Sequence, residues 1–163
     1  MYKHILVPID GSDTSARAFE AALELARENG AELQPLHAID LPTVALAVPG
    51  YDPAVVRTAF LQEGTEIVND ALERMHRDGV KGTSRIIEVN PLGDDIAQCI
   101  LRACVDLKAD LVVMGTHGRR GIQRLVLGSV AERFLRTSNC PVLLVPGRHD
   151  TQTMESIPAG PAK

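Results

Sequence analysis

The residues best suited to chemistry in this chain follow a short apolar run, in the segment GTHGRRGIQRLVLGS at 115–129. Glycines such as Gly115 and Gly118 let a backbone approach a ligand closely and adopt positive φ. Ser129 is expected at the head of a helix, where unpaired amides and the helix dipole favour a phosphate. Arg119 lies between them and offers planar donors that suit phosphate oxygens. The segment therefore predicts a binding loop for an anionic ligand.

The same residues also have a purely structural interpretation. Ser129 and Glu132 fit a capping box, in which the serine side chain caps the helix and the glutamate reaches back. Gly115 and Gly118 are also ordinary turn residues. Taken singly, each residue is better explained by a structural role. Their joint placement beyond the end of one strand is better explained by a bound ligand. The sequence alone leaves both interpretations open.

Length and composition describe one globular domain. The chain has 163 residues, 45% of them apolar, which allows a sizeable core without a disulfide or a metal. Its formal net charge of −4 argues against a nucleic-acid-binding protein. No apolar run approaches the roughly 18 residues of a membrane span, and the N-terminal run is too short for a secretory signal. The three cysteines lack zinc-ligand spacing, so we expect small buried thiols and a cytoplasmic location.

Apolar runs alternate with helical patterns along the whole chain. We expect strands at 4–9, 32–39, 84–89, 110–114 and 141–145. We expect helices at 14–29, 53–78, 94–108 and 129–137. The proline-broken stretch 41–52 is expected to be a loop packed against the body, and the polar segment 147–163 a disordered tail. The domain itself is therefore expected to span residues 1–146.

Strands separated by helices are typical of βαβ units and a parallel sheet. Because apolar runs such as 111–114 lack polar alternation, helices must cover both faces of that sheet. We predict a doubly wound, Rossmann-like α/β domain whose five parallel strands have the order 3-2-1-4-5. Ligands of such sheets bind beyond the carboxyl ends of the strands, where the strand order reverses. Pro8 should lie where pairing stops, and Pro35 should remove a ladder bond or create a bulge.

Several common signatures are absent from the sequence. It contains no GxxxxGK[ST], no GxGxxG after the first predicted strand, and no GxSxG, HExxH or kinase motif. The turn after the first predicted strand is instead DGSD at 10–13. The chain is therefore not a P-loop protein or a protein kinase.

A longer pattern joins the segments that follow the predicted strands. It consists of KHILVPIDGS at 3–12, LHAID at 36–40, ADLVVMGTHG at 109–118, GSVAER at 128–133 and CPVLLVP at 140–146. Gly115, Gly118, Gly128 and Ser129 complete the spacing G-x2-G-x9-G-[ST]. On these segments the sequence resembles the universal stress protein family, specifically its ATP-binding branch, from residue 2 to about residue 146.

The resemblance implies that ATP binds at the switch point between the first and fourth strands. The adenine would lie against main chain matching Ile9, Asp10 and Ala38, with the ribose near Asp10 and Gly115. The phosphates would lie near the glycines and the start of the fourth helix. The full set of expected binding residues is Pro8, Ile9, Asp10, Ala38, Met114, Gly115, His117, Gly118, Arg119, Gly128, Ser129 and Val130. The residues themselves support the phosphate side most strongly, and offer the base an apolar floor.

Several ionisable residues near the predicted strand ends keep more than one interpretation. Asp10 is a ribose acceptor, a magnesium ligand through water, or a turn former, and we favour the ribose. His117 either binds phosphates when cationic or stabilises its loop. His37 is expected to be a buried, hydrogen-bonded histidine. Asp94 and Asp95 are expected at a helix N-terminus, where they complement the dipole, rather than at a metal.

The leading hypothesis is a small cytoplasmic ATP-binding stress-response or regulatory protein, in which the nucleotide orders residues 116–127. ADP or AMP are alternative resident nucleotides, and magnesium is expected with them. No motif places a carboxylate to activate water, so we expect slow ATP hydrolysis at most, far below the roughly 10 s⁻¹ of typical enzymes.

Two other functional classes remain open. The first is a structural dimerisation or interaction module without a physiological nucleotide, paired through the exposed edge of the fifth strand. A homodimer is expected in either case, and an unidentified protein client is compatible with both. The second class is an adenylyl-transferring enzyme on a related fold, but its glycine-serine or paired-histidine signature after the first strand is missing.

Overall fold

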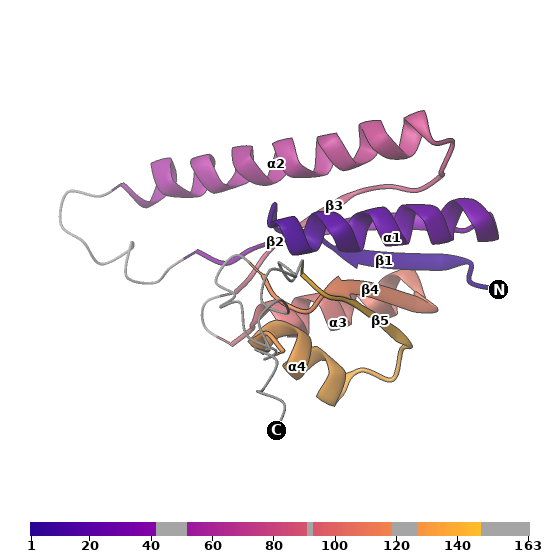
Figure 1. Cartoon of the computed structure of the whole chain (residues 1–163). Coiled ribbons are helices and arrows are strands. Elements are labelled where there is room, and N and C mark those ends of the chain that lie inside the picture. The colour runs from indigo at the N-terminus through magenta and orange to yellow at the C-terminus, as the bar shows by residue number, and fades with distance from the viewer. Residues whose placement is uncertain (42–51, 91–92, 119–126, 148–163) are drawn as a thin grey trace, which may run out of the picture.

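The computed structural model describes residues 1–41, 52–90, 93–118 and 127–147. Its elements alternate along the chain (Figure 1), in the order β1 (His4–Pro8), α1 (Asp13–Asn29), β2 (Glu32–Ile39), α2 (Pro53–Arg77), β3 (Arg85–Glu88), α3 (Ile96–Leu107), β4 (Leu111–Gly115), α4 (Ser129–Thr137) and β5 (Val142–Val145). Every predicted strand and helix is present, and each boundary lies within two residues of its prediction. The expected loop at 41–52 and the expected tail fall largely outside the described residues, as does Arg119.

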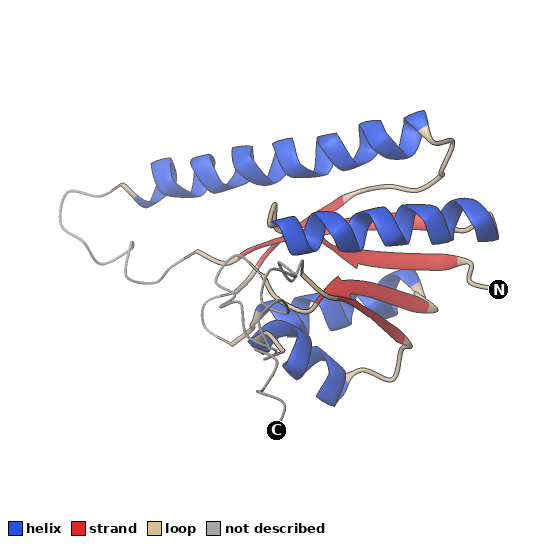
Figure 2. Cartoon of the chain, viewed as in Figure 1, coloured by secondary structure: helices blue, strands red, loops and turns tan. Residues whose placement is uncertain are grey.

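The five strands form one parallel sheet in the order β3-β2-β1-β4-β5, which confirms the predicted fold. Helices α1 and α2 cover one face of the sheet, and α3 and α4 cover the other (Figure 2). This arrangement explains why the strands read as continuous apolar runs, since both of their faces are buried. No helix in the described part of the chain is long and apolar enough to cross a membrane.

The core is divided by the sheet into two layers, and β1 contributes to both. Ile5 and Val7 pack with residues such as Phe19 on the α1–α2 side. Leu6, between them, packs with residues such as Phe134 on the α3–α4 side. Because successive side chains of a strand point to opposite faces, a run of apolar residues fills both layers at once.

Pro8 marks the point where β1 leaves β4. The C=O of His4 accepts a hydrogen bond from the N–H of Asp110, so even-numbered residues of β1 face β4. Pro8 is also even-numbered, so its backbone nitrogen faces β4, but proline has no N–H to donate. Within the described strands, the β1–β4 register ends at Leu6, whereas Pro8 still pairs with Leu36 of β2. Pairing with β4 has therefore stopped before Pro8, as predicted, while pairing with β2 continues, and the two central strands diverge at their carboxyl ends.

Pro35 lies within β2 without distorting it. The N–H of Leu33 donates to the C=O of Lys81 at 2.9 Å, on the side of the sheet where β3 lies. The backbone nitrogen of Pro35, two residues later, faces the same side. The β2–β3 ladder begins only at Leu36, one residue later. On the other side Pro35 pairs in register with Val7 of β1, so the expected bulge is absent from this strand. The proline's missing donor falls where β3 has not yet begun.

The thiols are free, and two of the three are buried. Cys99 and Cys104 are buried on α3, and Cys140 is half-buried before β5. Burial, together with a hydrogen bond to Cys104, raises the pKa of Cys140 to about 12. These cysteines therefore behave as packing residues, as predicted for Cys99 and Cys104.

Candidate functional site

The turn after β1 is held by its own side chains. The Oδ1 atom of Asp10 accepts hydrogen bonds from the N–H of Ser12 at 3.0 Å and from its hydroxyl at 2.6 Å. The N–H of Asp10 donates to the Oγ of Ser15 at 3.2 Å. Ser12 is in turn the N-cap of α1, where its side chain accepts from the N–H of Ser15. Asp10 therefore acts as a turn former, one of its three predicted roles.

The same aspartate meets the glycine-rich loop that follows β4. A Cβ at Gly118 would lie 2.8 Å from the Oδ2 of Asp10, closer than real Cβ contacts allow. Gly118 is exposed, and Asp10 is half-buried. The structure therefore brings together the two loops that the strand order places beyond β1 and β4.

Gly115, at the end of β4, packs against the start of α1. A Cβ there would lie 2.8 Å from the Cγ2 of Thr14 and 3.2 Å from its C=O. Thr14 was not predicted as a site residue. The available signal was its position at the start of the helix after DGSD, which places it near this edge of the sheet without showing which strand it contacts.

Gly128 closes the loop against its beginning. Its N–H donates to the C=O of Thr116 at 2.7 Å. A Cβ at Gly128 would lie 3.1 Å from that oxygen and 3.4 Å from the Cα of His117. Among the described residues, positive φ at glycine occurs at Gly11, Gly30, Gly79 and Gly82, and not in the motif. Of the two properties that glycine offers, the motif glycines therefore use close backbone approach and not positive φ.

The N-terminus of α4 differs from the prediction. Gly128 is the N-cap, with φ −63° and ψ 149°, and no side chain among the described residues caps this helix. Ser129 is its first residue and is exposed. Glu132 therefore lies one position too far along for a capping box, and its carboxylate pairs with Arg136 at 2.8 Å instead. The capping-box interpretation of Ser129 is wrong.

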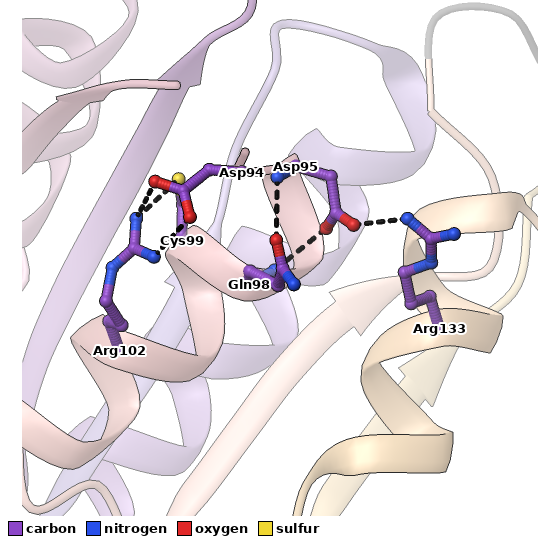
Figure 3. A network of polar contacts seen from close by, with 6 residues as sticks. All are labelled: Asp94, Asp95, Gln98, Cys99, Arg102 and Arg133. Atoms are coloured by element: carbon purple, nitrogen blue, oxygen red, sulfur yellow. Dashed lines mark hydrogen bonds and ion pairs between the residues drawn. The ribbon is translucent and has the colours of Figure 1, made fainter. Parts of the chain in front are cut away.

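A capping box forms instead at α3, whose N-terminus lies at the same edge of the sheet as that of α4 (Figure 3). The Oδ1 of Asp95 accepts from the N–H of Gln98 at 2.9 Å, and the Oε1 of Gln98 accepts from the N–H of Asp95 at 3.0 Å. Asp95 also accepts from Arg133, which reaches across from α4. Asp94 pairs with Arg102 through two hydrogen bonds of 2.8 and 2.9 Å. Asp95 therefore complements a helix N-terminus, as predicted, whereas Asp94 lies one residue before the cap and pairs with Arg102.

These contacts keep both carboxylates ionised. Burial opposes ionisation of Asp95, but hydrogen bonds from the Gln98 amide and from Arg133 outweigh it, so its pKa lies below the ordinary value. Hydrogen bonds from Arg102 lower the pKa of Asp94 in the same way. Within the described residues, no group of three His, Cys, Asp or Glu side chains is arranged to hold a metal ion.

The two histidines near the site have defined partners. The Nδ1 of His37 lies 2.8 Å from the C=O of Ile9, and the side chain is buried, as predicted. The Nδ1 of His117 lies 2.9 Å from the Oγ1 of Thr116. His117 therefore has a contact within its own loop, which fits the loop-stabilising alternative.

The predicted apolar floor is present at the ends of the central strands. Ile9 and Met114 are buried, and Pro8 and Ala38 are half-buried. Val130, in the first turn of α4, is half-buried as well. The described residues of the predicted site thus come from the ends of β1, β2 and β4 and from the start of α4.

A parallel sheet of order 3-2-1-4-5, with close-packed glycine loops beyond its diverging central strands, defines a Rossmann-like α/β domain of the switch-point type. The chain belongs to the universal stress protein family, whose family description matches residues 1–146. Universal stress protein MJ0531 of Methanocaldococcus jannaschii is 36% identical over 146 residues, which cover 89% of this chain and 82% of that protein.

Solved structures show the same family and fold. A universal stress protein from Burkholderia pseudomallei is 42% identical to this chain and superposes with a TM-score of 0.75. The match covers 90% of this chain and 97% of the Burkholderia chain. A universal stress protein in complex with cAMP is 27% identical to this chain and superposes with a TM-score of 0.63. The match covers 88% of this chain and 97% of that relative.

Proposed function

We propose that this protein is an ATP-binding regulatory protein of the cytoplasm, which holds the nucleotide between the carboxyl ends of β1 and β4. ADP and AMP are alternative occupants of the same site. The phosphates would lie at the N-terminus of α4, near Gly118, Gly128 and Ser129. The complex of a relative with cAMP supports an adenine nucleotide as the class of ligand.

The observation that carries this proposal is the uncapped start of α4. Unpaired amides of a helix N-terminus need an acceptor, and a phosphate meets both that need and the helix dipole. Side chains of Ser12, Asp52 and Asp95 fill this role at α1, α2 and α3. At α4 no side chain of the described part of the chain does so, and the N-cap is the glycine of the loop itself.

The base side of the proposed site has a different character. Ile9 and Met114 offer buried apolar surface, and Ala38 adds a half-buried edge from β2. An adenine ring buries apolar faces and requires only a few main-chain hydrogen bonds, so such a floor suits it. Asp10, beside Gly118, is placed between the base and phosphate sides, where we favour a ribose contact.

Magnesium would reach the site with the phosphates. The Oδ1 of Asp10 is engaged by Ser12, and the described residues provide no cluster of three ligands for the ion. Mg²⁺ commonly keeps several waters and binds through substrate phosphates. With no carboxylate positioned to activate water among the described residues of the site, we expect turnover to be slow.

The test is nucleotide retention by purified protein. Small molecules released from denatured wild type and from Gly118→Val are identified by mass spectrometry, and affinities are measured by calorimetry. We expect an adenine nucleotide with wild type and none with the variant, because the first added carbon already crowds Asp10. Gly93→Val is the matched control, since a Cβ there meets nothing within 4 Å. Equal nucleotide binding by both variants would remove the phosphate-loop proposal.

A second candidate function is a dimerisation module that needs no nucleotide. Strand β5 is an edge of the sheet, and Leu143 on it is 38% exposed. Exposed apolar edge strands invite pairing with a second chain. A homodimer that persists in nucleotide-free protein, together with no nucleotide recovered from cells, would favour this candidate.

A further inference from the structure

We propose that His37 is a positioning residue for the base side of the nucleotide site, and that Gly64 of α2 provides the space it needs. This inference rests on the proposed function. His37 lies near the carboxyl end of β2, and its side chain reaches the main chain of Ile9, just beyond the end of β1. It therefore acts through Ile9 and not by touching the ligand.

The contact with Ile9 is specific. Beyond the end of β1, the N–H of Ile9 still donates to the C=O of Leu36 at 2.8 Å. The C=O of Ile9 lies 2.8 Å from the Nδ1 of His37, and a carbonyl oxygen can only accept, so this nitrogen carries the proton. Both main-chain groups of Ile9 are thus held by β2, at the point where Pro8 has ended pairing with β4.

The imidazole is pressed against the backbone of α2. A Cβ at Gly64 would lie 2.7 Å from the Cδ2 of His37 and 3.3 Å from its Nε2. Gly64 is buried and lies in the middle of a 25-residue helix, where glycine is unfavourable relative to alanine. A helical glycine is tolerated here because any larger residue would displace the ring that holds Ile9.

The consequence is a direct mechanical connection from α2 to the floor of the site. Any shift of the imidazole moves the C=O of Ile9, and with it the start of the turn that contains Asp10. The phosphate side is built from β4 and the start of α4. It meets this connection where Gly118 lies against Asp10, and hydrogen bonds with Ser12 and Ser15 hold that turn without His37. Loss of the histidine should therefore weaken binding of the base and leave binding of the phosphates unchanged.

The experiment compares two probes, AMP and inorganic tripolyphosphate, by calorimetry on full-length variants. His37→Leu removes the donor at similar size, and His37→Asn keeps an N–H donor attached at Cγ, where Nδ1 is. We expect His37→Leu to lose at least about tenfold in AMP affinity with tripolyphosphate unchanged, as fits one buried hydrogen bond and its consequences. His37→Asn should stay within about threefold of wild type, and Gly64→Ala should fall between the two.

Controls separate this effect from general destabilisation and from failure of the proposed function. His76→Leu, at an exposed position of α2, should change neither affinity. If His37→Leu folds poorly, Gly64→Ala and His37→Asn still give the comparison between probes. AMP affinity unchanged in both His37→Leu and Gly64→Ala would overturn this inference alone. Wild type that binds neither probe would overturn the proposed function and this inference with it.

Discussion

The N-termini of α3 and α4 lie at the same edge of the sheet, yet they satisfy their first amides in opposite ways. At α3, Asp95 and Gln98 close a full capping box, and Arg133 neutralises the carboxylate. At α4, Gly128 offers no side chain at all. The start of α3 is therefore complete by itself, whereas the N-cap residue of α4 supplies no capping side chain. We propose that this contrast separates a structural N-terminus from a nucleotide-binding one within one domain.

The largest expected effect comes from giving α4 a cap of its own. Gly128→Asp places a carboxylate where we propose the phosphates bind, so it competes for the amides and repels the ligand. We expect nucleotide affinity to fall by roughly a hundredfold, as fits the loss of one or two charge-assisted hydrogen bonds. Titration calorimetry measures the change.

Gly128→Ala is the control for the crowding that any Cβ meets at this position, 3.1 Å from the C=O of Thr116. It should weaken the nucleotide less than Gly128→Asp does. If the two variants bind the nucleotide equally, the charge and capping of the added side chain have no effect on binding. The proposed contrast between the N-termini of α3 and α4 would then be wrong.

An intermediate effect, on stability alone, is expected at α3. Asp95→Ala removes the cap and should cost about 1–2 kcal/mol in the free energy of unfolding at neutral pH, with nucleotide affinity within about twofold of wild type. Because the folded pKa of Asp95 is lowered, its ionic contribution is present above the unfolded value of about 3.9 and is lost as pH falls through the folded pKa.

Urea unfolding at neutral pH and at progressively lower pH measures the difference in the free energy of unfolding between wild type and Asp95→Ala. This difference should become smaller as the pH falls. Asp95→Asn keeps a capping oxygen without the charge, so it should lose only the pH-dependent part of the stability that Asp95 contributes. A large loss of nucleotide affinity in Asp95→Ala would show instead that the α3 end belongs to the binding site.

The smallest effect is expected for Ser129→Ala. A capping serine would cost about 1 kcal/mol on removal, but this hydroxyl forms no cap, so the change should stay within about 0.5 kcal/mol. Nucleotide affinity should fall by only about threefold, since one neutral hydrogen bond to a phosphate oxygen is lost. Thermal unfolding and calorimetry on the same samples distinguish this outcome from a capping role, which would lower the melting temperature without ligand.

Much of the site was predictable because its signals are local. Apolar runs and their spacing predicted the elements, and the strand order then placed Asp10 and the motif glycines at one edge. Thr14 was missed, because its contact with Gly115 depends on how α1 crosses the end of β4. The capping-box interpretation of Ser129 was wrong, because a capping pattern does not reveal a shift of one residue in the start of a helix.

By itself the sequence determined which segments are strands and helices, that the sheet is parallel, and which loops lie beyond its central strands. These follow from side-chain periodicity and from proline's missing donor, which act within a few residues. Only the tertiary structure decided which helix N-terminus is left open, and that His37 holds Ile9 beneath α2. Those outcomes depend on contacts between residues far apart in the chain, where a few tenths of an ångström decide whether a side chain fits.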